Sequence, residues 1–81
     1  MWREKDDRLY RMFQFKDFVE AFGFMSQVAE AADGLNHHPK WTTQYNKVEI
    51  WLTTHSAGGK ITDKDRQLAK AIDAIYENYQ T

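Results

Sequence analysis

The side chains best suited to chemistry are the three histidines of the chain, which lie in two short segments. His37 and His38 are adjacent and precede Pro39, and His55 follows Thr54. Imidazole has an unperturbed pKa of about 6.5, so near neutral pH it can donate or accept a proton. A well-placed general acid or base contributes roughly 10²–10⁴ in rate. General acid–base catalysis is therefore the first chemistry to consider.

Other kinds of site compete with this interpretation. Three histidines form a known catalytic zinc set, but adjacent histidines on an extended segment usually diverge, and ligand spacings normally skip residues. We therefore rank a metal site below acid–base catalysis. Nucleophilic catalysis has little support, because the chain has no cysteine and no serine in a nucleophile elbow. Gly58-Gly59 lacks the spacing and the lysine–hydroxyl pair of a phosphate loop. Taken singly, each histidine is more often a surface or hydrogen-bonding residue.

A hairpin between the two segments could bring the imidazoles together. Residues 41–45 and 47–54 are strand-like runs separated by Asn46, which suits a tight turn. The second run alternates in the manner of a strand with one face on the core. Its aliphatic residues are Val48, Ile50 and Leu52. Trp51 falls on the opposite face, where it either covers the open side of the sheet or contacts a neighbouring subunit, and we favour the subunit contact.

Two strands and a helix are expected before the hairpin. Residues 8–15 have apolar side chains at period two, which predicts a strand, and a shorter strand at 2–5 precedes it. A helix should begin at Asp17, with Glu20 three residues later as in a capping box. Its core-facing stripe is predicted to be Phe18, Phe22, Met25, Ala29 and Ala32. Gly34 should then end the helix as a left-handed residue covered by Leu35.

The last predicted helix spans about 63–79. Thr62 suits its N-cap, and acidic residues follow in the first turn. The side expected to be buried consists of Leu68, Ala69, Ile72, Ile75, Tyr76 and Tyr79. The order of elements predicts an α+β fold over residues 1–81 as a single domain, with helices packed on one face of an antiparallel four-stranded sheet.

Composition limits the classes of function. The 81 residues are 42% hydrophobic and 15% aromatic, with a net charge of −1. Lysine and arginine alternate with acidic residues along the sequence, which disfavours nucleic-acid binding. The absence of cysteine excludes disulfides and thiolate ligands, and no apolar run is long enough for a membrane span. We therefore expect a cytoplasmic protein that self-associates.

Several blocks of residues occur in an order and spacing typical of one enzyme family. They are Phe15-Lys16-Asp17-Phe18, Ala21-Phe22-Gly23-Phe24-Met25, His37-His38-Pro39-Lys40-Trp41, Tyr45-Asn46-Lys47-Val48, Thr54-His55 and Thr62-Asp63-Lys64-Asp65. Together they resemble the pterin-4a-carbinolamine dehydratases over nearly the whole chain. Relative to longer members of that family, the chain begins later, without an N-terminal helix, and its glycine loop is one residue longer.

The resemblance implies a reaction that needs no metal or other cofactor. Loss of water from 4a-hydroxytetrahydrobiopterin gives quinonoid dihydropterin, which recycles the tetrahydrobiopterin spent by aromatic amino acid hydroxylases. By this resemblance, His37 and His55 donate protons at the 4a-hydroxyl. His38 mainly holds the pterin and shares in proton transfer. Asp65 orients or charge-stabilises a histidine.

The same resemblance implies further substrate-binding residues. Pro39 fixes the direction of the histidine segment, and Trp41 forms a wall against the flat ring system. The backbone of Thr54, Ser56 and Ala57 lies along the edge of the substrate.

A second class of function is a binding role. Some animal relatives act as a dimerisation cofactor and transcriptional coactivator for a homeodomain transcription factor, which they grip through a helical surface. The end of the last helix, with Ile75, Tyr76 and Tyr79, could supply such a surface. We favour a sister subunit there, in a homodimer or homotetramer, because closed homo-oligomers are common. A third interpretation, a metal-dependent hydrolase, predicts stoichiometric zinc.

Overall fold

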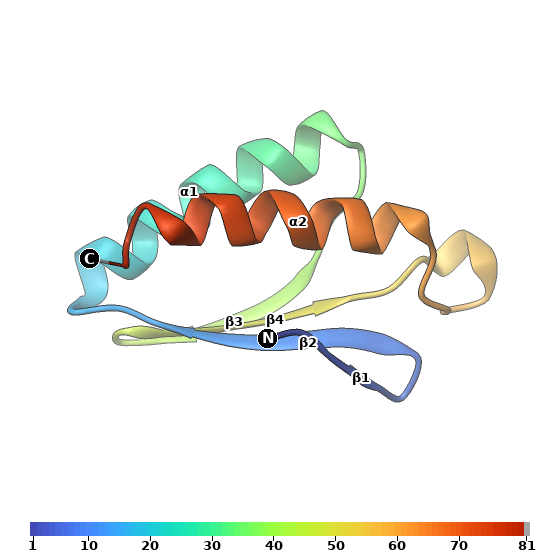
Figure 1. Cartoon of the computed structure of the whole chain (residues 1–81), viewed down its shortest axis with the longest axis horizontal. Coiled ribbons are helices and arrows are strands. Elements are labelled where there is room, and N and C mark those ends of the chain that lie inside the picture. The colour runs from blue at the N-terminus through green and yellow to red at the C-terminus, as the bar shows by residue number, and fades with distance from the viewer. Residues whose placement is uncertain (81) are drawn as a thin grey trace.

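Two helices cover one face of an antiparallel four-stranded sheet in the computed structural model, which describes residues 1–80 (Figure 1). In chain order the elements are β1 Arg3–Lys5, β2 Arg8–Gln14, α1 Phe18–Gly34, β3 Lys40–Gln44, β4 Lys47–Leu52, a 3-10 helix His55–Ala57 and α2 Asp63–Glu77. The order of strands in the sheet is β1-β2-β4-β3. The predicted fold class is confirmed. The single-domain assignment stays a prediction, and it includes Thr81, which lies outside the described residues.

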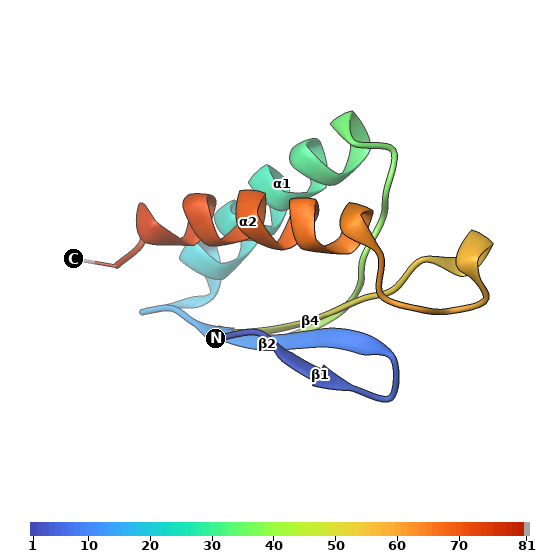
Figure 2. The same ribbon diagram turned by 45° about the vertical axis from the view of Figure 1, so that its right-hand side comes forward.

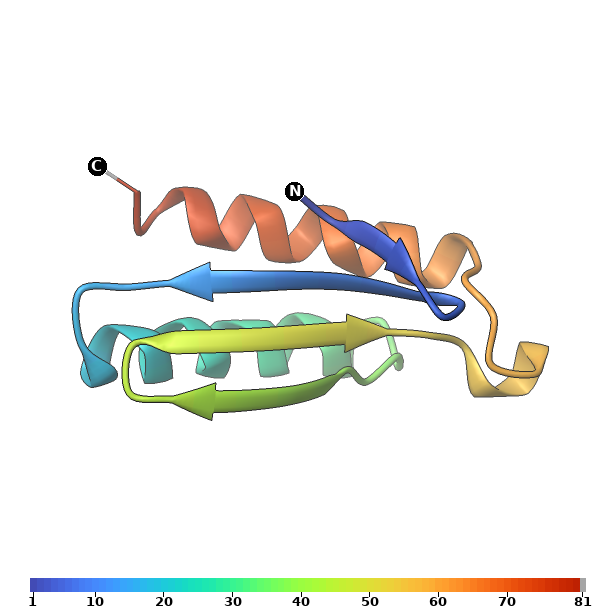
Figure 3. The same ribbon diagram turned by 90° about the horizontal axis from the view of Figure 1, so that it is seen from below.

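The uncovered face of the sheet is seen in Figure 3, where α1 runs behind β4 and β3 and α2 runs beside β2 and β1. Alternation along β2 and β4 produces the core, as predicted. Buried on the helix side are Leu9, Phe13, Val48, Ile50 and Leu52. The turn at 45–46 is also where it was expected, with Tyr45 in the left-handed region at φ 54°.

The predicted core stripe of α1 is wrong for most of its residues. Phe18 and Phe22 are 50% and 61% exposed, whereas the side chains that α1 buries are Ala21, Phe24, Val28 and Ala32. Phe24 packs against Phe13 of β2 at a ring-centroid distance of 5.0 Å. Apolar residues cover so much of this helix that two stripes have helical spacing, and spacing alone does not choose between them. The small Ala21 side chain favours the observed stripe, since it lets α1 approach its neighbours closely.

The end of α1 also differs from the expectation. Gly34 is the last helical residue, and the left-handed residue is Asn36, at φ 51°. Asparagine tolerates this conformation better than most residues because its short polar side chain can hydrogen-bond locally. Leu35 is 37% exposed and does not form the expected cover. The His37 amide then donates to the Ala32 carbonyl at 3.0 Å, so the histidine segment begins attached to the end of α1.

Helix α2 presents the predicted residues to the core. Leu68 and Ile72 are fully buried, and the Tyr76 hydroxyl donates to the Gln14 carbonyl of β2 at 3.0 Å. Ile75 and Tyr79 are half-buried against the same core. The end of α2 is therefore not the free apolar surface that the sequence suggested. Within residues 1–80, neither helix is both long and apolar enough to cross a membrane.

Candidate active site

A buried hydrogen bond joins the histidine segment to the start of α2. The Nε2 atom of His37 lies 2.5 Å from Oδ1 of Asp65, although the two residues are 28 positions apart. The side chains of His37 and Asp65 are 11% and 0% exposed. A contact this well buried fixes the direction of the imidazole ring.

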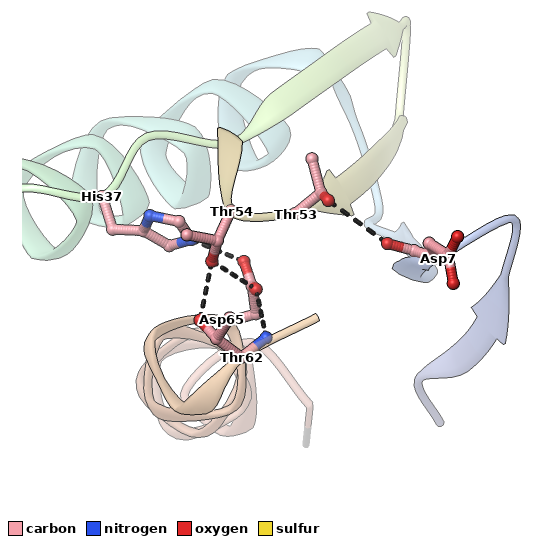
Figure 4. Close-up of polar contacts among 6 residues, drawn as sticks. All are labelled: Asp7, His37, Thr53, Thr54, Thr62 and Asp65. Carbon is pink, nitrogen blue, oxygen red and sulfur yellow. Dashed lines mark hydrogen bonds and ion pairs between the residues drawn. The ribbon is translucent and has the colours of Figure 1, made fainter. Parts of the chain in front are cut away.

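The Asp65 carboxylate is the centre of a hydrogen-bond network. Its Oδ2 atom accepts from the Thr54 hydroxyl at 2.8 Å and from the Thr62 amide at 2.9 Å. Burial raises the pKa of this carboxyl, but the hydrogen bonds from His37, the Thr62 amide and the Thr54 hydroxyl outweigh it, so the pKa is below its ordinary value. The carboxylate therefore stays ionised near neutral pH. Figure 4 shows it pointing from α2 toward Thr54 and His37.

The network also fixes where the hydrogen atoms are. Asp65 is ionised and can only accept, so His37 donates to it from Nε2. Thr54 has one hydroxyl hydrogen and gives it to Asp65, so the Thr62 hydroxyl donates to the Thr54 oxygen across 2.7 Å. Nδ1 of His37 is then the ring nitrogen left to exchange a proton with a ligand.

The other two histidines are much more exposed than His37. Nε2 of His38 lies 3.3 Å from Oδ1 of Asp33, and these side chains are 61% and 84% exposed. His55 begins the 3-10 helix that follows β4, and this turn projects beyond the end of the sheet (Figure 2). Its backbone is held by the Gly58 amide, which donates to the His55 carbonyl at 2.9 Å.

The loop behind His55 depends on two glycines. Gly58 and Gly59 have φ angles of 78° and 75°, where a side chain would be strained. The Gly59 amide donates to the Thr54 carbonyl at 3.0 Å, and the Thr54 amide donates to the Lys60 carbonyl at the same distance. The loop thus closes on the end of β4 and holds His55 beside the first histidine segment.

The three histidines line one open cavity of about 240 Å³. Of the other predicted site residues, Thr54 and Ser56 also line it. Ala57 is not among its lining residues, and Pro39 and Trp41 line a neighbouring hollow of about 470 Å³ against α1, which His38 shares. The structure therefore brings the imidazoles together and leaves Trp41 on the far side of His38.

Three lining residues were missed by the sequence analysis. Asn36, Thr53 and Lys64 all border the cavity of the three histidines. The signal for Asn36 was its place at the end of a helix, where asparagine favours the left-handed conformation. Lys64 directly precedes Asp65, so a contact predicted for the aspartate extends to its neighbour. Across residues 1–80, no three histidine, aspartate or glutamate side chains are arranged to hold a metal ion.

A family model and several relatives match nearly the whole chain. Residues 1–75 match the family described as pterin 4 alpha carbinolamine dehydratase. The chain belongs to this pterin-4a-carbinolamine dehydratase family. A relative in Synechococcus sp. (strain WH7803), provisionally named as a dehydratase of this kind, is 53% identical over 74 residues, which are 91% of this chain and 78% of the relative. A relative in Rhodospirillum rubrum with the same provisional name is 57% identical over 67 residues, 83% of this chain and 69% of the relative.

This dehydratase-family chain is also similar in structure to proteins whose structures are solved. The crystal structure of a transcriptional coactivator/pterin dehydratase from Brucella melitensis has a TM-score of 0.87 and 44% identity, covering 93% of this chain and 81% of that one. A pterin dehydratase-like protein, a RuBisCO assembly factor in the alpha-carboxysome, has a TM-score of 0.79 at 22% identity, covering 93% and 88%. The second likeness concerns the fold alone. The family predicted from the sequence blocks is confirmed.

Proposed function

We propose that the chain is a hydro-lyase that dehydrates pterin-4a-carbinolamine, with the three histidines around the substrate. The dehydratase activity follows from the family and from relatives that are about half identical to this chain. The observation that supports the histidine mechanism is the single cavity lined by His37, His38 and His55. A cytoplasmic location, predicted from the sequence, belongs to the same proposal.

The reaction requires two proton transfers. Hydroxide is a poor leaving group, so an acid must protonate the 4a-hydroxyl as its carbon–oxygen bond breaks, and a base must remove a proton from the pterin ring. The products are then water and the quinonoid dihydropterin, and no net proton is consumed. Imidazole can do either task near neutral pH.

His37 and His55 are the proton donors in this proposal, and Asp65 positions His37. The carboxylate holds Nε2 of His37, so the ring presents Nδ1 to the substrate, with a negative charge beside it when the ring carries the extra proton. His38 holds the pterin and takes part in proton transfer. Thr54, Ser56 and Ala57 lie along the substrate edge, while Pro39 and Trp41 bound the site from the side of α1.

The direct test is to replace His37 and His55 with alanine, singly and together. Chemically generated carbinolamine is followed by ultraviolet absorbance as it dehydrates with and without protein. The double variant should retain its fold by circular dichroism and lose nearly all activity, because each acid or base contributes roughly 10²–10⁴ in rate.

His55→Ala keeps this test decisive if loss of His37 disturbs folding, because His55 is exposed and the protein does not need it for packing. Gln67→Ala is the matched control, an exposed residue on α2 outside the cavity. Wild-type turnover by the double variant would end the assignment.

We also propose that the chain self-associates through α1, as a homodimer or homotetramer. The support is the exposed apolar patch formed by Phe18, Val19 and Phe22, which are 50%, 77% and 61% exposed. These residues lie within one turn of the helix, so a second α1 could cover them together. A second copy of the chain is the simplest occupant, because homo-oligomers with closed symmetry predominate among soluble assemblies.

Light scattering on Phe18→Ser/Phe22→Ser tests this association. The wild type should have a mass above that of the monomer, and the double variant should have the mass of the monomer. Met12→Ser is the control, since Met12 is also an exposed apolar residue, at 42%, but lies on the sheet. A monomeric wild type would overturn self-association and favour the alternative role, in which the chain grips helices of another protein.

A further inference from the structure

A second hollow adjoins the cavity of the three histidines on the uncovered face of the sheet. It has a volume of about 170 Å³ and shares His38, Thr53 and His55 with the first cavity. Its remaining wall includes Arg8 of β2 and Trp51 of β4. A ligand held between His38 and His55 would therefore lie at the edge of this hollow.

The hollow is basic although the chain as a whole has a net charge of −1. Arg8 and Lys40 line it together with the two histidines, and no acidic residue is part of its lining. Neither cation forms an ion pair with any residue in the described part of the chain. The Nζ atom of Lys40 instead lies 5.5 Å from the centre of the Trp51 ring.

This local charge arises from the strand register. Residues directly opposite one another in an antiparallel pair share a face, and Trp51 is paired with both Tyr10 and Lys40. The register puts one set of cations on the uncovered face: Arg3, Lys5, Arg8, Lys40 and Lys47. Glu49 is the acidic strand residue on that face, and the Tyr10 hydroxyl donates to it at 2.6 Å. The fold thus brings lysine and arginine residues together on the uncovered face of the sheet, although they alternate with acidic residues in the sequence.

Acidic residues do lie near the hollow. Asp6 borders the next depression along the sheet, which Arg8 and Trp51 also line. The Asp7 carbonyl accepts from the Thr53 hydroxyl at 3.2 Å (Figure 4). Since Asp6 forms no ion pair with Arg8, the positive charge of Arg8 remains available to a ligand.

From this geometry we infer that the adjoining hollow binds an anionic substituent on the pterin, so that the substrate class is pterins whose side chain carries a phosphate or carboxylate. The inference rests on the proposed function, because it needs a pterin between the histidines. Arg8 and Lys40 would each donate charge-assisted hydrogen bonds to the anion. The guanidinium of Arg8 can donate two such bonds at once to the oxygens of a carboxylate or a phosphate. Trp51 would pack against the apolar part of the side chain.

A matched pair of ligands tests this inference without catalysis. The probes are 6-hydroxymethyl-7,8-dihydropterin and its monophosphate ester, titrated against the full chain while tryptophan fluorescence is recorded. The ester should bind about threefold to tenfold more tightly, as expected for two partly solvated ion pairs. This preference should shrink as salt is added, because exposed charges are screened. A third probe, 6-carboxypterin, tells whether a carboxylate has the same effect as a phosphate.

Arg8→Gln/Lys40→Gln is the decisive variant. It should bind the ester and the alcohol with affinities within about twofold of each other, while its affinity for the alcohol stays near that of the wild type. Lys16→Gln/Lys47→Gln is the control, since it removes the same charge from exposed residues outside the hollow and should keep the preference.

The outcomes separate the inference from the proposed function. If the wild type binds the alcohol and dehydrates carbinolamine but gains nothing from phosphate or carboxylate, the anion site is wrong and the dehydratase assignment stands. An unchanged preference in Arg8→Gln/Lys40→Gln would also overturn the site. If the protein neither dehydrates carbinolamine nor binds any of the three pterins, the proposed function fails first.

Discussion

His37 and His38 are neighbours in the sequence but occupy opposite environments. His37 is 11% exposed and contacts a fully buried carboxylate, whereas His38 is 61% exposed and faces an aspartate that is 84% exposed. The buried contact is also the shorter one: Nε2 of His37 lies 2.5 Å from Oδ1 of Asp65, and Nε2 of His38 lies 3.3 Å from Oδ1 of Asp33. One imidazole is therefore fixed by the fold, and the other can move with a ligand.

This difference suggests a division of labour. A proton donor must be oriented before the substrate arrives, because small errors in position are costly in rate. A residue that grips the substrate can instead adjust as it binds. We accordingly expect His37 to act mainly on the rate of the chemical step and His38 mainly on substrate affinity.

The largest effect should separate His37→Ala from His38→Ala in steady-state kinetics. Loss of His37 should lower kcat by about 100-fold or more, in the range for a general acid or base. Loss of His38 should chiefly raise KM and lower kcat by less than about tenfold. Equal kcat losses in the two variants would remove the proposed division.

The next largest effect should be the difference in stability between variants of Asp65 and Asp33, the carboxylates that contact His37 and His38. Asp65→Ala leaves His37, the Thr54 hydroxyl and the Thr62 amide without their common partner, and should destabilise the fold by about 3 kcal/mol. Asp33→Ala removes only an exposed contact and should cause no resolvable change. Urea denaturation of both variants measures the difference. A similar free energy of unfolding for the two would mean that burial of the pair contributes little.

Part of the Asp65 contribution should depend on pH. The pKa of this carboxyl is below its ordinary value in the folded chain, while the unfolded chain has a pKa of about 3.9. The stabilisation is therefore complete above about pH 5 and is lost as the pH falls through the lowered pKa of the folded state. Urea denaturation of wild type and Asp65→Asn should give free energies of unfolding that converge in acid. Parallel curves would contradict the lowered pKa.

A smaller effect should distinguish two adjacent threonines beside this pair. Thr54→Val removes a buried hydroxyl that donates to Asp65, and should cost about 1 kcal/mol of stability. Thr53→Val makes the same nearly isosteric change but removes a more exposed hydrogen bond, from the Thr53 hydroxyl to the Asp7 carbonyl. Its loss of stability should therefore be smaller. Thermal unfolding of both variants gives the comparison, and a larger loss for Thr53 would reverse it.

The sequence predicted the sheet better than the helix packing. Val48, Ile50 and Leu52 alternate with polar residues, and only one register of β4 buries all three. Helix α1 is apolar on several sides, so Phe22 and Phe24 were equally plausible core residues by spacing. Phe24 is selected by two rings outside the helix, Phe13 of β2 and Phe15 just after it, and such a contact has no local signal.

The candidate site shows the same limit. Residue type alone singled out the three histidines as candidates, and the resemblance to a known family added Asp65. The identity of the histidine that contacts Asp65 depends on how α1 ends and where α2 begins, and the start of α2 is far from His37 in the sequence. The basic hollow was missed for a related reason, since Arg8 and Lys40 are far apart in sequence and become neighbours of Trp51 only through the strand register.

Asp65 serves two structures at once, because the carboxylate that holds His37 also accepts from the amide of Thr62, where α2 begins. Fraying of the first turn of α2 would therefore release the imidazole while the sheet is still intact. On gentle warming, turnover should therefore fall at a lower temperature than that of global unfolding. The loss of activity would report local unfolding of the first turn of α2.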